Sequence, residues 1–202
     1  MPQTLYLASA SPRRREILHA LGFRTLPLPA EIDETALPGE AVADYVARMA
    51  RQKNAAARQI LRQRGEEPIW PVLSADTVVA LEGQILGKPR DAAHARAMLE
   101  SLSGREHQVW TAVCVSHGEQ TLVAAQRSDV RFKSLSAQEI QAYIDSGEPL
   151  DKAGAYGIQG VGGIFVAHLA GSFSGVMGLP VFETVQLLRQ LGAEVPPFGQ
   201  AT

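Results

Sequence analysis

The chain opens with the sequence TLYLASASPRRREILHALG (residues 4–22), in which a short apolar strand leads directly into a helix. Ser11 is a favoured N-cap residue, Pro12 suits the first helical position, and Gly22 is typical of a helix end. Because a second strand is expected near residues 25–28, the opening predicts a β-α-β unit. Such a unit favours an α/β fold.

The first turn of this helix carries three consecutive arginines, Arg13 to Arg15, where acidic side chains are normally favoured. The positive end of the helix dipole and its unpaired backbone N–H groups disfavour added cations until an anion binds. The residue three positions after Ser11 is Arg14, so no capping box occupies this end. The stretch therefore predicts an anion site, and a solvated basic turn is the alternative.

Strands and helices alternate along the rest of the chain. The spacing of apolar residues predicts a long helix over about residues 40–64. The other expected elements are strands at 71–81 and 84–86, a helix at 91–102, a hairpin of 108–116 and 121–133, and helices at 136–146 and 180–191. We expect residues 1–202 to form a single domain: a mixed, twisted α/β sheet flanked by helices, with two lobes around a substrate cleft.

The composition narrows the class of protein. The chain has 202 residues, 46% of them hydrophobic, so it is long enough to bury a substantial core. Its net charge of −2 excludes the basic excess of a general nucleic-acid binder. Cys114 is the only cysteine, so neither an intrachain disulfide nor a cysteine zinc site is expected. No signal-peptide pattern and no apolar run of ~18 residues is found, so we expect a cytoplasmic protein without a membrane span.

Three charged residues stand in unusual surroundings. Asp76 interrupts the aliphatic run VLSADTVVAL (72–81), and a buried carboxylate is costly unless it is paired, protonated or bound to metal. Lys53 lies on the apolar face of the long helix, where its ammonium must reach solvent or meet an anion. Lys88 precedes a helix in the segment GKPRD (87–91), which alone indicates little.

Two familiar phosphate-binding motifs are excluded. The segment GQILGKP (83–89) has one residue too few between its glycines for a P-loop. The segment GIQGVGG (157–163) precedes the strand-like run Ile164-Phe165-Val166 instead of opening a helix, so it is no dinucleotide fingerprint. What remains is a set of cations, the carboxylates of Glu34 and Asp76, and a glycine-rich loop with Gln159. Hydrolysis of a polyphosphate needs such groups to neutralise oxygens, hold a metal and a water, and read a ring.

Six ordered segments resemble motifs of the Maf family of nucleoside triphosphate pyrophosphatases, and together they cover nearly the whole chain. They are LASASPRR (7–14), ADTVV (75–79), GKP (87–89), LSG with HQV (102–104 and 107–109), DKAGAYGIQG (151–160) and GLP (178–180). The resemblance implies a Maf/ITPase-like fold and cleavage between the α and β phosphates of a nucleotide. It also implies a divalent cation, Mg²⁺, Mn²⁺ or Co²⁺.

The resemblance also implies the site. The family's active-site positions fall on Ser11, Arg13, Arg14, Glu34, Lys53, Asp76 and Lys88, and its specificity positions on Arg13, Thr77 and Gln159. We expect Asp76, Glu34, Lys53 and Lys88 to be catalytic, with Asp76 as the base and with Glu34 and Asp76 holding the metal and its water. Substrate binding is expected from Ser11, Arg13, Arg14, Thr77 and Gln159, and Lys53 and Lys88 also hold the triphosphate.

The late motif DKAGAYGIQG is similar to that of the dTTP/UTP-hydrolysing subgroup. An amide such as that of Gln159 can offer both a donor and an acceptor to thymine or uracil. The alternatives are a pyrophosphatase for ITP and XTP or for 7-methyl-GTP, and a noncatalytic nucleotide-binding regulator of division. The Gln159 loop argues against the first group, and the acid in the strand argues against the second.

The resemblance implies a biological setting as well. It suggests removal of noncanonical nucleotides, restraint of cell division and a homodimer. The expected partner is the nucleoside triphosphate substrate, with no stable nucleic acid and no membrane.

Overall fold

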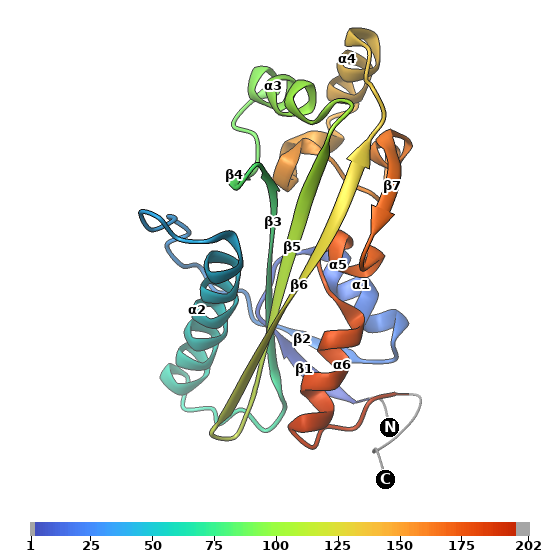
Figure 1. Cartoon of the computed structure of the whole chain (residues 1–202). Helices are drawn as coiled ribbons and strands as arrows, with labels where there is room; N and C mark the ends of the chain where they lie inside the picture. Colours follow the sequence, from blue (N-terminus) through green and yellow to red (C-terminus); the bar gives the residue numbers. More distant parts are fainter. Residues whose placement is uncertain (1–2, 197–202) are drawn as a thin grey trace. The chain divides into compact units, whose positions relative to one another are not determined.

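The computed structural model describes residues 3–196, and the strands of this part form one seven-stranded sheet (Figure 1). The strand order is β2-β1-β3-β5-β6-β7, and β4 pairs with β3. Strand β1 (Thr4–Leu7) runs parallel to β2 (Arg24–Pro27) and to β3 (Val72–Leu81). Strand β4 (Gln84–Leu86) is antiparallel to β3. The expected mixed sheet flanked by helices is confirmed.

The chain forms two compact units. Unit 1 comprises the chain up to Asp76, Thr111–Gln126 and the chain from Gly178 onward; unit 2 comprises Thr77–Trp110 and Arg127–Met177. Strands β5 (Glu106–His117) and β6 (Gln120–Phe132) each contribute to both units. The hairpin expected between them is confirmed, and its turn is tighter than predicted because only Gly118 and Glu119 separate the strands. The predicted cleft between two lobes stays a prediction.

In unit 1, helices cover both faces of the strands (Figure 1). Helices α1 (Pro12–Ala20) and α6 (Val181–Gln190) bury leucines against one face, and α2 (Val42–Gln63) buries Ala57 and Leu61 against the other. Alternate residues of β3 point to opposite faces, so Leu73 joins the α1 and α6 side while Val72 joins the α2 side.

Buried polar groups fix the position of α2 on the sheet. Asn54 Nδ2 donates to the Val72 carbonyl at 2.8 Å, and the Ser116 hydroxyl donates to Asn54 Oδ1 at 2.7 Å. The Ser74 hydroxyl donates to the Ala50 carbonyl at 2.7 Å. Buried polar groups are costly to leave unpaired, and a shift of α2 along β3 would break these hydrogen bonds. The pairings therefore favour a single register of the helix against the strand.

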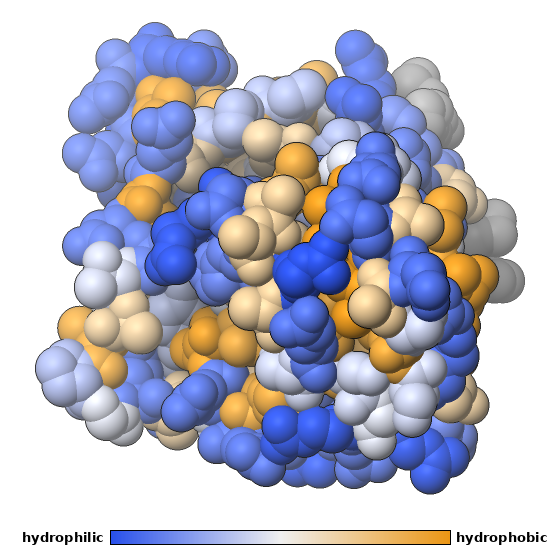
Figure 2. Space-filling view, turned by 90° about the horizontal axis from the view of Figure 1, so that it is seen from above, coloured by the Kyte–Doolittle hydropathy of each residue, from blue (hydrophilic) through white to orange (hydrophobic). Residues whose placement is uncertain are grey.

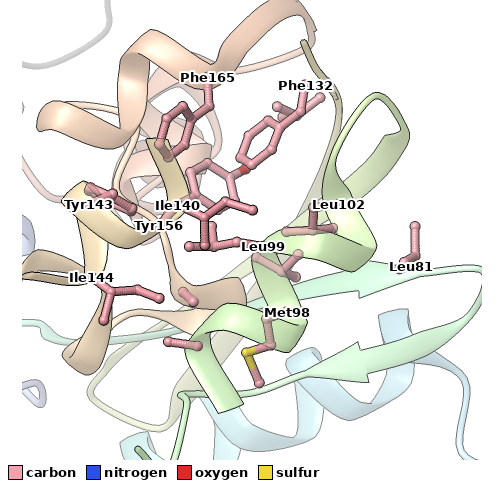
Figure 3. Packing of buried hydrophobic residues seen from close by; sticks show 14 of the residues in the cluster. Leu81, Met98, Leu99, Leu102, Phe132, Ile140, Tyr143, Ile144, Tyr156 and Phe165 are labelled. Atoms are coloured by element: carbon pink, nitrogen blue, oxygen red, sulfur yellow. The ribbon is translucent and has the colours of Figure 1, made fainter. Parts of the chain in front are cut away.

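Unit 2 has its own core, which Figure 3 shows from close by. Helices α3 (Ala92–Leu102) and α4 (Ala137–Asp145) bury Leu99, Leu102 and Ile140 around an aromatic cluster. In that cluster the rings of Phe132 and Tyr156 meet edge to face, with centroids 4.7 Å apart. The remaining elements are the 3-10 helices η1 (Glu148–Asp151), η2 (Ala153–Ala155) and η3 (Val161–Phe165), strand β7 (Val166–Ala170) and helix α5 (Phe173–Met177).

Both predicted helix starts in unit 2 are confirmed. Asp91 caps α3 by accepting from the His94 N–H at 2.7 Å, and Ser136 forms a capping box with Glu139 at the start of α4. The strand predicted at Ile164-Phe165-Val166 is wrong for its first two residues, which belong to η3; β7 begins at Val166.

The surface seen in Figure 2 is mainly hydrophilic, and hydrophobic residues show between the polar ones in small patches. Among residues 3–196, no helix is long and apolar enough to cross a membrane. The single thiol, Cys114, lies buried in β5, and burial raises its pKa to about 11.

Candidate active site

The start of α1 is built as the sequence predicts. Ser11 occupies the N-cap position in extended conformation and Pro12 the first helical position, and the Ser11 side chain makes no capping hydrogen bond. The Ser11 N–H donates to Ser9 Oγ at 3.2 Å. Ser9 is a support that the sequence analysis did not single out, although it stands in the motif LASASPRR.

Arg14 is anchored beside this helix start. Its Nη1 donates to Ser9 Oγ at 2.9 Å and its Nε donates to the Gly178 carbonyl at 2.7 Å. Burial lowers the pKa of Arg14, and the neighbouring charge of Arg13 acts in the same direction, while Asp76 and Glu34 oppose them. A guanidinium held in this way gains from an incoming anion, because the anion stabilises the positive charge in place of the hydration that burial removes.

Asp76, the last residue of unit 1 on β3, meets Lys53 of α2. Lys53 Nζ lies 2.6 Å from Asp76 Oδ1 and 2.6 Å from Glu34 Oε1. The Asp76 residue is only 8% exposed, so the predicted buried carboxylate is confirmed. The two acids thus share one ammonium. The predicted roles of Lys53 in catalysis and in holding the triphosphate stay predictions.

The electrostatics of this cluster single out Asp76. Burial raises the pKa of its carboxyl, and the charge of Glu34 adds to this, while Lys53 and Arg14 pull it back. Burial prevails, so the carboxylate takes up a proton more readily than an exposed aspartate does. That is the property required of a general base.

The loop that carries Glu34 is tied to α2 by two side chains that the sequence analysis missed. The Tyr45 hydroxyl donates to the Glu34 carbonyl at 2.9 Å. Arg48 donates to the Thr35 carbonyl at 3.0 Å and to both carboxylate oxygens of Glu40 at 2.6 Å. The hydrogen bonds to Glu34 and Thr35 end on backbone oxygens, which leave no signal in the sequence.

The donor set fits a divalent metal in part. Among the described residues, no three His, Cys, Asp or Glu side chains form a group that could hold an ion by themselves. However, the carboxylates of Glu34 and Asp76 converge on one cation, the Lys53 ammonium. Mg²⁺ is commonly held in nucleotide enzymes by one or two carboxylates, with substrate phosphates and waters completing its shell.

The other predicted residues lie in unit 2. Thr77 follows Asp76 on β3 and is half-buried, while Lys88 and Gln159 are exposed. The Gly154 N–H donates to the Gly87 carbonyl at 3.1 Å, which holds the segment before Lys88 against the start of the glycine-rich region. The structure therefore brings together Arg14, Glu34, Lys53 and Asp76. The convergence of Lys88, Thr77 and Gln159 with them stays a prediction.

Comparison with known proteins shows the family. A nucleoside triphosphate pyrophosphatase of Haemophilus ducreyi is 56% identical over 98% of this chain and 100% of its own. A dTTP/UTP pyrophosphatase of Pasteurella multocida is 60% identical over 94% of this chain and 96% of its own. One of Neisseria gonorrhoeae is 53% identical over 96% of each chain.

Among solved structures, the Ham1 protein of Staphylococcus aureus matches with a TM-score of 0.46 and 15% identity, covering 64% of this chain and 72% of that chain. The model of the family described as Maf-like protein matches residues 4–191. The chain belongs to the Maf family, as its motifs predict.

Proposed function

We propose that the protein hydrolyses dTTP and UTP between the α and β phosphates, releasing a nucleoside monophosphate and pyrophosphate. The observation that carries this proposal is the buried Asp76 carboxylate, which pairs with Lys53, shares that ammonium with Glu34 and is influenced by the charge of Arg14. The names of the relatives support the choice of substrates.

The start of α1 binds the phosphates in this proposal. The backbone N–H groups after Ser11 and the positive helix end attract phosphate oxygens, and Arg13 and Arg14 add charge. Each charge-assisted hydrogen bond contributes about 1.5–3 kcal/mol when water is excluded. Contacts to the leaving pyrophosphate strengthen as its charge grows, so they stabilise the transition state more than the bound substrate.

Asp76 is the base. A water attacks the α phosphorus, its proton passes to Asp76 Oδ, and the bond from the α phosphorus to the bridging oxygen breaks, which leaves the electron pair on pyrophosphate. The raised pKa of Asp76 favours this transfer. Lys53 keeps Asp76 and Glu34 in place before substrate arrives.

Glu34 and Asp76 would hold a divalent cation, Mg²⁺, Mn²⁺ or Co²⁺, which when bound neutralises phosphate oxygens. Lys88 would bind the phosphate tail. Thr77 and Gln159 would read the base, since the Gln159 amide offers a donor and an acceptor. We also place the enzyme in the cytoplasm as a homodimer that clears the nucleotide pool and restrains division.

A panel of nucleoside triphosphates tests the substrate, with pyrophosphate release measured with and without each metal. We expect dTTP and UTP to be preferred and turnover to require metal. Preference for ITP, XTP or 7-methyl-GTP would contradict the substrate assignment. If no nucleotide is turned over, the proposed activity is wrong and the alternative of a noncatalytic nucleotide-binding protein is favoured.

Replacing Asp76 tests the base. Asp76→Asn should lower kcat by about 10²-fold or more and leave the fold intact, because the amide cannot accept the proton. Asp44→Asn is the matched control, since it removes an exposed carboxylate from the first turn of α2. A near-parental rate for Asp76→Asn on dTTP would show that the base lies elsewhere.

A further inference from the structure

Glu148, the first residue of η1, accepts three hydrogen bonds from two separate segments of unit 2, α4 and η3. Its Oε1 accepts from the Tyr143 hydroxyl at 2.9 Å and from the Gly162 N–H at 3.3 Å, and its Oε2 accepts from the Val161 N–H at 2.9 Å. Burial acts to raise the pKa of this carboxyl, but the three donors hold it below its ordinary value. The group is therefore a charged anchor near neutral pH.

The anchor extends to the other end of the glycine-rich loop through Tyr143. The Tyr143 hydroxyl, while donating to Glu148, accepts from the Gly157 N–H at 3.1 Å. The carboxylate and the hydroxyl together therefore hold residues on both sides of Gln159. The Glu148 backbone is itself held, because its carbonyl accepts from Lys152 Nζ at 2.7 Å.

The loop is shaped to fit this carboxylate. A Cβ atom added to Gly160 would overlap the Glu148 carboxylate, so the absence of a side chain at Gly160 is what allows the close approach. A segment with glycines at 157, 160, 162 and 163 loses much conformational entropy on being ordered. Glu148 supplies fixed acceptors that offset this cost, and between the anchored N–H groups Gln159 projects as an exposed side chain.

We propose that Glu148 is a positioning residue for substrate specificity: it fixes the loop so that the Gln159 amide is presented in one orientation to the pyrimidine edge. This inference rests on the proposed function, because it takes Gln159 as the reader of the base. A rigidly held amide discriminates by donor and acceptor placement, whereas an amide on a mobile loop adapts to either arrangement.

Glu148→Gln is the decisive variant, because it keeps the shape but replaces one acceptor oxygen by an amide donor. Uracil and cytosine differ in the hydrogen-bond donors and acceptors on the ring edge that the Gln159 amide would contact. We therefore expect kcat/KM for UTP to fall about tenfold while that for CTP changes little, so the UTP/CTP ratio falls. In a Gln159→Ala background Glu148→Gln should leave the ratio unchanged, since the effect passes through Gln159.

Glu139→Gln is the matched control. Glu139 also accepts from a backbone N–H and a hydroxyl, those of Ser136, and pairs with Lys133 in the same unit. This variant should lower stability without altering the UTP/CTP ratio. An unchanged ratio in Glu148→Gln, or an equal fall in the Gln159→Ala background, would overturn the inference.

Hydrogen exchange of the unliganded protein gives a readout that is independent of turnover. Glu148→Gln should speed exchange of the Val161 and Gly162 amides at least tenfold, and Glu139→Gln should not. Unchanged protection of these amides would show that Glu148 does not hold the loop. A parent enzyme with no preference for UTP would instead refute the proposed function, and this result differs from both outcomes.

Discussion

At the scale of single residues, one lysine pairs with two acids, so the three groups keep one negative charge when all are ionised. The ammonium of Lys53 lies 2.6 Å from oxygens of both Glu34 and Asp76. Without it, the buried Asp76 carboxylate would feel the charge of the largely exposed Glu34 carboxylate with no lysine to oppose it, which is costly for the ionised form of Asp76. Lys53 thus opposes the rise that burial causes in the pKa of the proposed base, and it also holds that base in position.

Replacing Lys53 should therefore change the pH dependence. In Lys53→Met the pKa of Asp76, already raised by burial, should rise further, because the nearby positive charge of Lys53 that lowers it is removed. A base must be deprotonated, so the acid limb of the rate profile should move to higher pH by about one pH unit or more. The rate profile and a carboxyl ¹³C NMR titration of Asp76 without substrate measure this.

Lys133→Met, which breaks an ion pair with Glu139 in unit 2, is the control and should leave the acid limb in place. An Asp76 titration that does not move in Lys53→Met would show that other groups control its protonation.

The local hydrophobic pattern was sufficient to single out Asp76 and Lys53 as unusual. It did not predict that these two residues pair with each other. Asp76 breaks an aliphatic strand and Lys53 sits on an apolar helix face, so each violates its own hydrophobic pattern. The ion pair joins residues that are 23 positions apart in the sequence. Lys53 meets Asp76 because of the position in which α2 packs on β3. That seating is decided by Asn54 and Ser74, whose hydrogen bonds end on backbone carbonyls and follow no spacing rule.

At the scale of elements, the loop before α2 depends on that helix for its shape. Tyr45 reaches back to the Glu34 carbonyl, and Arg48, which also lies 5.5 Å from the centre of the Tyr45 ring, reaches the Thr35 carbonyl. The position of the Glu34 carboxylate is thus controlled from the first two turns of α2.

Tyr45→Phe tests this control. The variant removes the hydrogen bond to the Glu34 carbonyl and should cost about 1 kcal/mol of unfolding free energy. It should also raise the metal concentration needed for half-maximal activity several-fold, because Glu34 is no longer held in place. Denaturant unfolding and metal titration of the rate measure the two effects.

Tyr6→Phe, at a half-buried tyrosine on β1 of the same unit, is the control and should leave the metal dependence unchanged. The same metal requirement in Tyr45→Phe as in the parent would show that the loop holds Glu34 without Tyr45.

Element boundaries followed from the sequence where end signals are local. Two helix starts are marked by contacts within one turn, Ser136 with Glu139 and Asp91 with His94. A third is marked by Pro12, whose fixed φ suits the first helical position. The strand prediction failed at Ile164 and Phe165, because a short apolar run has the same sequence pattern in a strand and in a buried turn. There the preceding glycines and the capture of the Val161 and Gly162 N–H groups by Glu148 favour a 3-10 turn.

At the scale of the whole molecule, each unit has its own core, and the core of unit 2 encloses a histidine. His107 is 2% exposed, its Nε2 lies 2.8 Å from the Tyr156 hydroxyl, and its ring meets Phe132 edge to face. Its Nδ1 has no hydrogen-bond partner among the described residues. Burial lowers the pKa of His107 to about 4, so the ring is neutral in the folded protein near pH 7.

Stability should therefore fall on acidification. Between about pH 6.5, near the pKa of an unfolded histidine, and pH 4, the unfolded chain binds a proton that the folded chain excludes. The contribution of His107 is complete above this window and is lost as the pH falls through it, by about 3 kcal/mol. Urea unfolding at several pH values measures the slope.

His107→Gln should remove most of this dependence of the unfolding free energy on pH. The core of this variant should also be less stable than that of the parent at every pH. His168→Gln, at an exposed histidine of β7, should leave the slope as it is. Equal slopes in the parent and His107→Gln would contradict the assignment.

The buried Cys114 has a practical consequence for labelling. Its thiol lies in β5 with no exposed surface and with a pKa raised to about 11, so little thiolate exists near neutrality and a maleimide cannot reach it. A cysteine introduced at one surface position can therefore carry a fluorophore or spin label selectively, with the native sulfur left in place and the wild-type packing of the strand undisturbed.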